Sequence, residues 1–350
     1  MRSFDYSVLK NKTWDNEILG LVAQIHEYKG RQELYLQQKP EELDRLVEIA
    51  KIQSTEASNE IEGIRTTNTR LKQLVADKTA PRNRDEEEIM GYRDVLNTIH
   101  ENYEYIPIRA NYILQLHRDL FRYSEKGIGG HFKNTQNYIS ATDSEGNEFV
   151  LFTPVSPYET PPAVDAICES YNRVSDTQEI DALLLTPVFI HDFLCIHPFN
   201  DGNGRMSRLL TTLLLYKSGY VIGKYISLES KIAKNENLYY DALEACQRGW
   251  YENQEDPAPF IKYLLRTILA AYRDFEDRVD LVSEKLPAVE VVRRAVYGKI
   301  GKFTKRDIME LCPAIGKTSV ENSIKQLVDR GVLVKHGSGR STYYTRSDAE

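Results

Sequence analysis

The feature that most constrains the fold is a very apolar segment from about Ile180 to Cys195, IDALLLTPVFIHDFLC. Its longest apolar run, Ala182–Ile196, contains Pro187, His191 and Asp192 and is shorter than the roughly 20 apolar residues that span a bilayer. A helix that is apolar around its whole circumference must be buried on all sides. The segment therefore predicts a central core helix in a soluble globular protein, and no transmembrane helix.

The length and the charge distribution predict a modular chain. At 350 residues, the chain exceeds the roughly 100 to 200 residues of a single domain. Its net charge is −7, but residues 285–350 contain 13 Lys and Arg against 7 Asp and Glu, a net charge of +6. We expect three segments: a helical N-terminal region over residues 1–100, a core over residues 101–284, and a basic C-terminal module over residues 285–350.

The cysteines and the N-terminus narrow the class of protein. The cysteines form no CxxC pair, which disfavours a zinc finger and a disulfide framework and predicts buried thiols. Residues 1–17 lack a continuous apolar core and a small-residue cleavage site, so we expect a cytoplasmic protein.

Periodic patterns predict a mainly α-helical chain with one β-hairpin. Apolar residues recur at three- and four-residue steps over residues 40–63, which predicts an amphipathic helix that a glycine ends. Further helices are expected over residues 85–100 and 108–121. β-prone residues flank a turn in NYISATDSEGNEFVLF, which predicts a hairpin with residues 143–147 at its tip.

The most informative residues are the twelve that begin at His197, HPFNDGNGRMSR. The glycines let successive backbone N–H groups face an anion, and a helix beginning near Gly204 adds unpaired amides and its dipole. Arg205 and Arg208 lie three residues apart, so both guanidiniums are expected to point towards this anion cradle. Asp201 offers a hard oxygen ligand suited to Mg²⁺, and His197 offers a base. The combination indicates phosphoryl-type transfer.

These twelve residues resemble the complete signature HPFxDGNGRxxR of Fic-domain proteins, and the resemblance covers roughly residues 100–270. It implies an all-α core with one β-hairpin, and transfer of AMP from ATP to a hydroxyl of a target protein with Mg²⁺. Two alternatives use the same site: the removal of AMP, and the transfer of another phosphate-containing group. A third belongs to another class, a transcription regulator whose core senses nucleotide.

The resemblance also implies roles for individual residues. His197 would be the base for the incoming hydroxyl and Asp201 the metal ligand, while Arg205 would hold the β-phosphate and Arg208 the γ-phosphate. The α- and β-phosphates would also be held by Gly202, Asn203 and Gly204. The hairpin would pin the target segment by strand addition, with residues 136–139 against residues 149–152. The flap residues expected to dock the target are Gln136, Asn137, Tyr138, Ile139, Val150, Leu151 and Phe152.

A second resemblance lies upstream, in SNEIEG. Ser58, Glu62 and Gly63 match the pattern [S/T]xxxE[G/N] of Fic proteins with an N-terminal inhibitory helix. The resemblance implies that Glu62 pairs with Arg208 and so withholds this arginine from the γ-phosphate. The expected partner is a target protein with a Ser, Thr or Tyr hydroxyl. Self-modification and a homo-oligomer are left open.

The C-terminal module resembles a winged helix-turn-helix. Two helices are expected over residues 303–311 and 318–330, with Thr318 and Glu321 as a capping box, and the strands GVLVKH and STYYTR follow. The basic residues that would contact DNA are Lys325, Arg330, Lys335, Arg340 and Arg346. Docking to another protein is the alternative.

Some polar residues are expected to be structural. We interpret the acidic run Asp85–Glu88 as a solvated helix start. The histidines expected to have structural roles are His26, His100, His117, His131 and His191.

Overall fold

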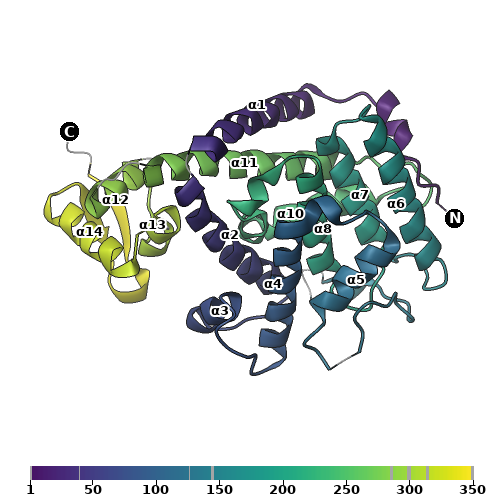
Figure 1. Ribbon diagram of the computed structural model, residues 1–350, viewed down its shortest axis with the longest axis horizontal. Helices are drawn as coiled ribbons and strands as arrows, with labels where there is room; N and C mark the ends of the chain where they lie inside the picture. The colour runs from purple at the N-terminus through teal and green to yellow at the C-terminus, as the bar shows by residue number, and fades with distance from the viewer. Residues whose placement is uncertain are drawn as a thin grey trace. The chain divides into compact units, whose positions relative to one another are not determined.

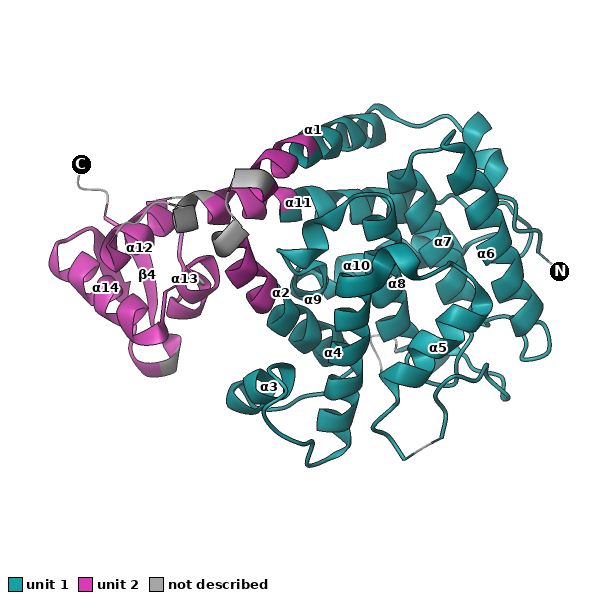
Figure 2. Ribbon diagram, in the orientation of Figure 1, with its two compact units in different colours: residues 1–29, 50–271 teal, residues 30–49, 272–350 magenta. Residues whose placement is uncertain are grey.

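The computed structural model describes residues 2–38, 40–125, 127–142, 146–283, 287–297, 301–312 and 315–347. These residues are mainly α-helical (Figure 1), and they include two antiparallel two-stranded hairpins. The chain forms two compact units, residues 1–29 with 50–271 and residues 30–49 with 272–350 (Figure 2). The unit boundaries fall inside helices, so the units differ from the three expected sequence segments, which stay a prediction.

The α-helices of the described residues are α1 (Asn16–Gln38), α2 (Pro40–Ile61), α3 (Asn68–Val75), α4 (Arg84–Asn102), α5 (Ala110–Leu120), α6 (Thr160–Thr177), α7 (Ala182–Ile196), α8 (Asn203–Lys217), α9 (Leu228–Lys234), α10 (Glu236–Gln247), α11 (Ala258–Ser283), α12 (Ala288–Tyr297), α13 (Lys305–Leu311) and α14 (Lys317–Asp329). The strands are β1 (Ile139–Thr142), β2 (Glu148–Phe152), β3 (Leu333–His336) and β4 (Tyr343–Arg346). Short 3₁₀ helices cover Tyr6–Asn11, Tyr103–Tyr105, Val221–Lys224 and Gly339–Ser341. Within the described ranges, no helix has the length and apolar character needed to cross a membrane.

The core of the first unit is built around α7. Asp181 caps the helix by accepting a hydrogen bond from the Leu183 backbone N–H, and every residue from Leu183 to Ile196 is buried. The helix packs against α6 and α8. On α8, the leucines at positions 209, 210, 213 and 214 are buried as well. The expected mainly α-helical fold and the central position of the apolar helix are therefore confirmed, and the core holds both ends of the intervening loop.

The first hairpin starts later than expected. β1 pairs with β2 in a register that places Ser140 opposite Val150, with an irregularity between Ile139 and Ser140. Residues 136–138 precede the strand, and two of their side chains bond elsewhere: Gln136 Nε2 donates to the Pro154 carbonyl at 3.0 Å, and Asn137 Nδ2 donates to the Phe199 carbonyl at 3.0 Å. Of the expected tip, residues 143–145 lie outside the described residues.

The acidic start of α4 is not the solvated surface that we expected. The Glu86 carboxylate is buried against Arg70, at 2.6 Å from Nη2, and this guanidinium lowers the pKa of Glu86 to about 2. Glu88 is also buried, and it pairs with Arg205 of α8. The expectation was wrong because both carboxylates face arginines of other helices, α3 and α8, rather than water.

The C-terminal part of the second unit has its own apolar core, formed mainly by α12, α13 and α14. The expected capping box at Thr318 is wrong, because α14 begins after Gly316 and Glu321 instead pairs with Lys305 at 2.8 Å. A capping box does occur at Thr304 and Asp307, at the start of α13. The order of helices followed by the β3–β4 hairpin agrees with the expected order, and the winged-helix assignment stays a prediction. Residues 313 and 314 and the side chain of Arg340 lie outside the described residues.

Candidate active site

His197 follows directly after α7, in a left-handed backbone conformation with φ of 51°. This conformation is uncommon for a residue other than glycine, and here the backbone N–H donates to the Phe193 carbonyl at 2.9 Å. The ring Nδ1 lies 3.2 Å from the Leu194 carbonyl, so Nδ1 carries the proton and Nε2 keeps its lone pair. Burial lowers the pKa of His197 to about 4. The ring is therefore uncharged near neutral pH and able to accept a proton.

The loop after His197 leaves the N-terminus of α8 open. Gly202 precedes the helix with φ of 84°, and a Cβ at this position would lie 2.9 Å from the Phe121 ring. Asn203 fastens the loop, because its Oδ1 accepts from the Phe199 N–H at 2.9 Å and its Nδ2 donates to the Phe199 carbonyl at 2.7 Å. No side chain caps the helix. The first amides of α8 can therefore receive an anion, and the helix dipole favours it.

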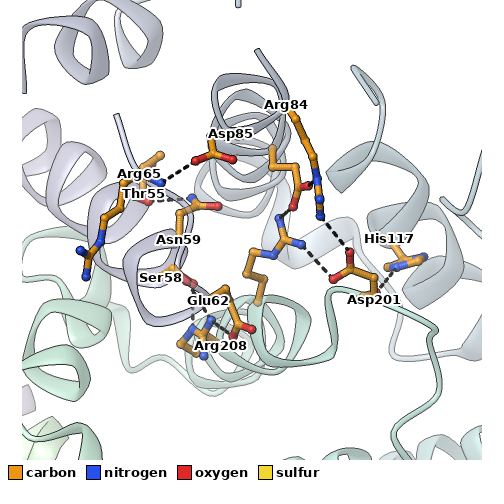
Figure 3. Close-up of polar contacts among 12 residues, drawn as sticks. Thr55, Ser58, Asn59, Glu62, Arg65, Arg84, Asp85, His117, Asp201 and Arg208 are labelled. Atoms are coloured by element: carbon orange, nitrogen blue, oxygen red, sulfur yellow. Dashed lines mark hydrogen bonds and ion pairs between the residues drawn. The ribbon is translucent and has the colours of Figure 1, made fainter. Parts of the chain in front are cut away.

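His117 of α5 supports the same loop from behind. Its ring stacks on Phe199 with centroids 3.7 Å apart, and its Nδ1 accepts from the Gly130 N–H at 3.1 Å. Nε2 must then carry the proton that is donated to the Asp201 carbonyl at 3.0 Å (Figure 3). Burial lowers the pKa of His117 to about 4, which keeps the ring in this neutral form. The structural role expected for His117 thus consists in positioning the loop, which the sequence alone did not indicate.

Arg205 does not point into the anion cradle as expected. Its Nη1 lies 2.7 Å from Glu88 Oε2 and its Nη2 lies 3.4 Å from Asp201 Oδ1. The side chain is buried and lies outside the lining of the cavity that contains His197. The expectation failed because the spacing of the two arginines could not reveal Glu88. The contact of Arg205 with a β-phosphate stays a prediction.

Asp201 is the residue that could hold a divalent cation. Its side chain is 37% exposed and faces the cavity, with Arg84 Nη2 at 3.8 Å from its Oδ2. The described residues contain no group of three or more His, Cys, Asp or Glu that could bind a metal by themselves. A single carboxylate fits Mg²⁺ when phosphate oxygens and waters supply the remaining ligands.

Glu62 and Arg208 form the ion pair that was expected from the upstream motif. Arg208 Nη2 lies 2.7 Å from Glu62 Oε1, and the Ser58 hydroxyl and carbonyl accept from Arg208 Nε and Nη2 at 2.8 and 2.9 Å (Figure 3). A Cβ on Gly204 would lie 2.2 Å from Glu62 Oε1, so only glycine admits the carboxylate this close to α8. Gly63 follows with φ of 75°. The carboxylate therefore lies at the open end of the anion cradle.

A second polar contact fixes α2, which carries Ser58 near its end. The buried Glu229 carboxylate of α9 accepts from Ser54 Oγ at 2.7 Å and from the Tyr92 hydroxyl at 3.1 Å. Ser227 also donates to it, at 3.2 Å. No sequence motif indicated Glu229, because its partners on α2 and α4, Ser54 and Tyr92, lie more than a hundred residues away along the chain.

His197, the loop residues 200–204, Arg208 and Glu62 line one cavity of about 570 Å³, a size typical of ligand pockets. Besides the loop, its walls come from the hairpin and from α10, a helix whose role the sequence did not indicate. The lining residues of the hairpin are Ile139, Ser140, Ala141 and Leu151, and those of α10 are Tyr239, Tyr240, Leu243, Glu244 and Gln247. Of the other expected flap residues, Tyr138 and Val150 are exposed and Phe152 stacks on Tyr251.

The fold and the site together define a helical protein with a neutral histidine beside an uncapped helix N-terminus. Residues 107–215 match the sequence model of the Fic/DOC family, and the chain contains a Fic domain. This agrees with the resemblance of the twelve-residue signature.

Individual relatives extend this result. The chain is 28% identical over 165 residues to the protein adenylyltransferase fic-1 of Caenorhabditis elegans, across 47% of this chain and 28% of that protein. It is 25% identical over 239 residues to the protein adenylyltransferase Fic of Nematostella vectensis, across 64% of this chain and 48% of that protein. The chain therefore spans about a quarter to a half of the length of these relatives.

A solved structure shows the same fold. The Fic family protein from Desulfovibrio desulfuricans aligns over 97% of this chain and 98% of its own, with a TM-score of 0.62 and 20% identity. The Fic-type fold expected from the sequence is thus confirmed.

Proposed function

We propose that the chain is a protein adenylyltransferase that transfers AMP from ATP to a hydroxyl side chain of a target protein in the cytoplasm. The observation that carries the proposal is the neutral His197 ring in one cavity with the uncapped N-terminus of α8. The names of the relatives support this class of reaction.

His197 would act as the base. The hydroxyl oxygen of the target forms a bond to the α-phosphorus, while the bond from this phosphorus to the oxygen that bridges to the β-phosphate breaks. The hydroxyl proton passes to His197 Nε2, and pyrophosphate leaves with the electron pair of the broken bond. The contact of Nδ1 with the Leu194 carbonyl supports this role because it keeps the Nε2 lone pair available.

The open end of α8 would bind the phosphates. The backbone amides of Gly202, Asn203 and Gly204 would receive the α- and β-phosphates, and Arg208 would receive the γ-phosphate once Glu62 moves away. The Asn203 side chain is already used within the loop, so its contribution would come from the backbone. Asp201 would hold Mg²⁺, which supplies charge neutralisation at the phosphate oxygens when bound.

The wall formed by α10 would receive the adenine base. Tyr239 and Tyr240 offer aromatic rings to the cavity, and Leu243 adds apolar surface on the same helix. Flat aromatic side chains pack well against a planar heterocycle. Gln247 could supply a hydrogen bond that selects the base.

The β1–β2 hairpin would dock the target. Among the residues that the structure describes, its strands pair only with each other, so one edge of each strand is open for an added strand. Phe149 and Val150 are exposed, while Leu151 lines the cavity. Main-chain pairing of a target segment with one of these open edges would bring a Ser, Thr or Tyr hydroxyl of the target to His197.

We further propose that Glu62 keeps the enzyme inhibited. The carboxylate occupies Arg208 and lies against Gly204, where the phosphates would bind. It would repel the triphosphate and displace the α-phosphate from its line with the attacking hydroxyl. Transfer needs the attacking oxygen and the α-phosphorus to lie about 3 to 3.5 Å apart and to be aligned, so this displacement would lower the rate.

The test compares wild type with Glu62→Gly, using ATP labelled separately at the α- and γ-phosphate. AMP transfer predicts that the variant deposits the α-label, and not the γ-label, on itself or on a partner protein. Freeing Arg208 is expected to raise labelling by roughly fivefold to thirtyfold, the equivalent of about 1 to 2 kcal/mol. Deposition of γ-label would overturn the proposed reaction. A variant that binds ATP and labels no more than wild type would overturn the inhibition.

AMP removal at the same site is the second candidate, and one observation favours it. Glu62 lines the cavity together with His197, so its carboxylate could orient a water towards a bound AMP ester. A protein labelled by Glu62→Gly provides the substrate for the test. Release of AMP by wild type, and not by Glu62→Gly, would establish this direction.

The C-terminal module adds a separate proposal, a winged helix that contacts DNA. Lys325, Arg330, Lys335 and Arg346 are exposed on it, in a segment with a net charge of +6. Phosphate contacts weaken steeply with salt, so binding to duplex DNA should fall as salt rises from 50 to 200 mM. An absence of binding at low salt would favour the alternative, docking to another protein.

A further inference from the structure

The segment between α5 and the β1–β2 hairpin contacts the last residue of α7 and the loop after it at a row of backbone carbonyls. Lys133 Nζ donates to the Ile196 carbonyl at 2.9 Å, and the Lys133 backbone N–H donates to the Pro198 carbonyl at 2.8 Å. Asn137 Nδ2 donates to the carbonyls of His197 and Phe199 at 3.3 and 3.0 Å. Two residues therefore satisfy four successive carbonyls, from residue 196 to residue 199.

The two side chains also hold each other. Lys133 Nζ donates to Asn137 Oδ1 at 2.8 Å, which leaves the Asn137 amide oriented with its N–H groups towards the loop. Lys133 is buried, so its ammonium group is surrounded by these oxygen acceptors rather than by water. Ile196 is the last residue of α7, where carbonyls lack helical partners and a positive charge is favourable.

We infer that Lys133 and Asn137 form a clamp that positions His197 for proton transfer, a role that rests on the proposed function. His197 sits in an uncommon backbone conformation, so its ring direction depends on the carbonyls on either side of it. Asn137 also stands two residues before β1, in the same segment as the flap. The clamp thereby connects β1, the strand that would dock the target, to the backbone of His197, the proposed base.

Electrostatics offer a readout that a purely structural role would not change. The Lys133 charge lowers the pKa of His197 in addition to burial, whereas Glu62 raises it. Burial lowers the pKa of Lys133 itself to about 8, so the ammonium is still mostly charged at pH 7. Removing that charge should raise the pKa of His197. Below this pKa the base is protonated, so the acid limb of the rate profile should move to higher pH.

The experiment uses the full chain with Glu62→Gly as the active background. Lys133→Met removes the charge and the donor, Lys133→Arg keeps the charge, and Asn137→Ala removes the amide. Lys10→Met and Asn102→Ala are the matched controls, because Lys10 pairs with Glu179 at the surface and Asn102 is exposed and donates to the Thr98 carbonyl within α4. The charged groups that line the cavity, Asp201, Arg208 and Glu244, are the same in every variant.

The first readout is the rate of AMP transfer from α-labelled ATP. Misplacement of a catalytic group by about 1 Å can cost about a hundredfold, so Lys133→Met and Asn137→Ala should lower kcat by about tenfold to a hundredfold. The KM for ATP should change by less than about threefold, because the amides of α8 that would hold the phosphates are unchanged. Both controls should keep the background rate. Clamp variants with rates within about twofold of the background would overturn the inference.

The second readout is independent of activity. NMR of ring-labelled histidine, with the His197 signal assigned through its loss in His197→Ala, gives the pKa of this ring directly. We expect the pKa to rise in Lys133→Met and to stay near the background value in Lys133→Arg. A pKa that is the same in all variants would overturn the inference.

The two readouts distinguish a failure of the clamp from a failure of the proposed function. If Glu62→Gly binds ATP and transfers no AMP, the proposed function fails while the NMR comparison still decides the clamp. If circular dichroism shows that Lys133→Met does not fold, Asn137→Ala provides the test of the clamp. The clamp predicts faster amide hydrogen exchange of residues 197–203 in Asn137→Ala than in the background. Exchange as slow as in Asn102→Ala would then overturn the clamp.

Discussion

Two ion pairs on α8 have the same length but differ in the exposure of their carboxylates. Arg205 pairs with Glu88 of α4, and Arg208 pairs with Glu62 at the end of α2, each with a nitrogen–oxygen distance of 2.7 Å. Both guanidiniums are almost fully buried. The Glu88 side chain is 1% exposed, whereas the Glu62 side chain is 32% exposed and lines the cavity. Only one of the two carboxylates can therefore be replaced by an anion that enters from solvent.

This difference separates a structural pair from one that can switch. Glu88 lies within α4 and also accepts from Arg84 Nε at 2.7 Å, so moving it would leave charges buried without partners. Glu62 follows the last residue of α2 and precedes a glycine in the left-handed conformation, so a small backbone change could withdraw it. We therefore expect Arg205 to hold Asp201 and the loop, and Arg208 to alternate between Glu62 and phosphate.

The largest effect is expected when the base is removed and Arg208 is already free of Glu62. In the Glu62→Gly background, His197→Ala should lower AMP transfer by about 10² to 10⁴-fold, the usual contribution of a positioned base. ATP binding should change little, because the arginines and the amides of α8 remain. His131→Ala is the matched control, since His131 is an exposed histidine outside the cavity lining. Unchanged transfer in His197→Ala would refute the role of His197.

The next effect concerns stability and tests the comparison directly. Glu88→Ala leaves Arg205 buried with Asp201, at 3.4 Å, as its remaining carboxylate contact among the described residues, and breaking a buried pair typically costs about 3 to 5 kcal/mol. Glu62→Ala leaves Arg208 with both Ser58 contacts and open to cavity water, so its cost should be about 1 kcal/mol or less. Urea denaturation of both variants gives the two free energies of unfolding. Equal losses would mean that both pairs are structural.

The parts of the site that the sequence predicted are those encoded by short, local patterns. The glycine-rich loop, the helices on either side of it and the contact between Glu62 and Arg208 all follow from two short motifs. The apolar run of α7 was sufficient to place the loop at the core, because a helix without a polar face has no exposed alternative.

The parts that were missed depend on contacts between distant segments. Nothing near Glu88 in the sequence shows that Arg205 will neutralise it, so its acidic run was interpreted as solvated. His117, Lys133 and Asn137 support the loop from another segment of the chain; His117 and Lys133 belong to no motif that we recognised, and Asn137 was expected only as a flap residue. Asn137 was expected in a strand, whereas its side chain holds the loop and β1 begins two residues later.

The smallest expected effect sharpens the account of the switchable pair. Ser58→Ala removes the hydroxyl that accepts from Arg208 Nε and leaves the Ser58 carbonyl and Glu62 in place. A hydrogen bond of this kind contributes about 0.5 to 1.5 kcal/mol, so basal α-label transfer should rise about twofold to tenfold, and less than in Glu62→Gly. Ser58→Thr keeps the hydroxyl and should stay near wild type. If Ser58→Ala matched Glu62→Gly, the hydroxyl rather than the carboxylate would hold Arg208, and the greater exposure of Glu62 would no longer explain the switch.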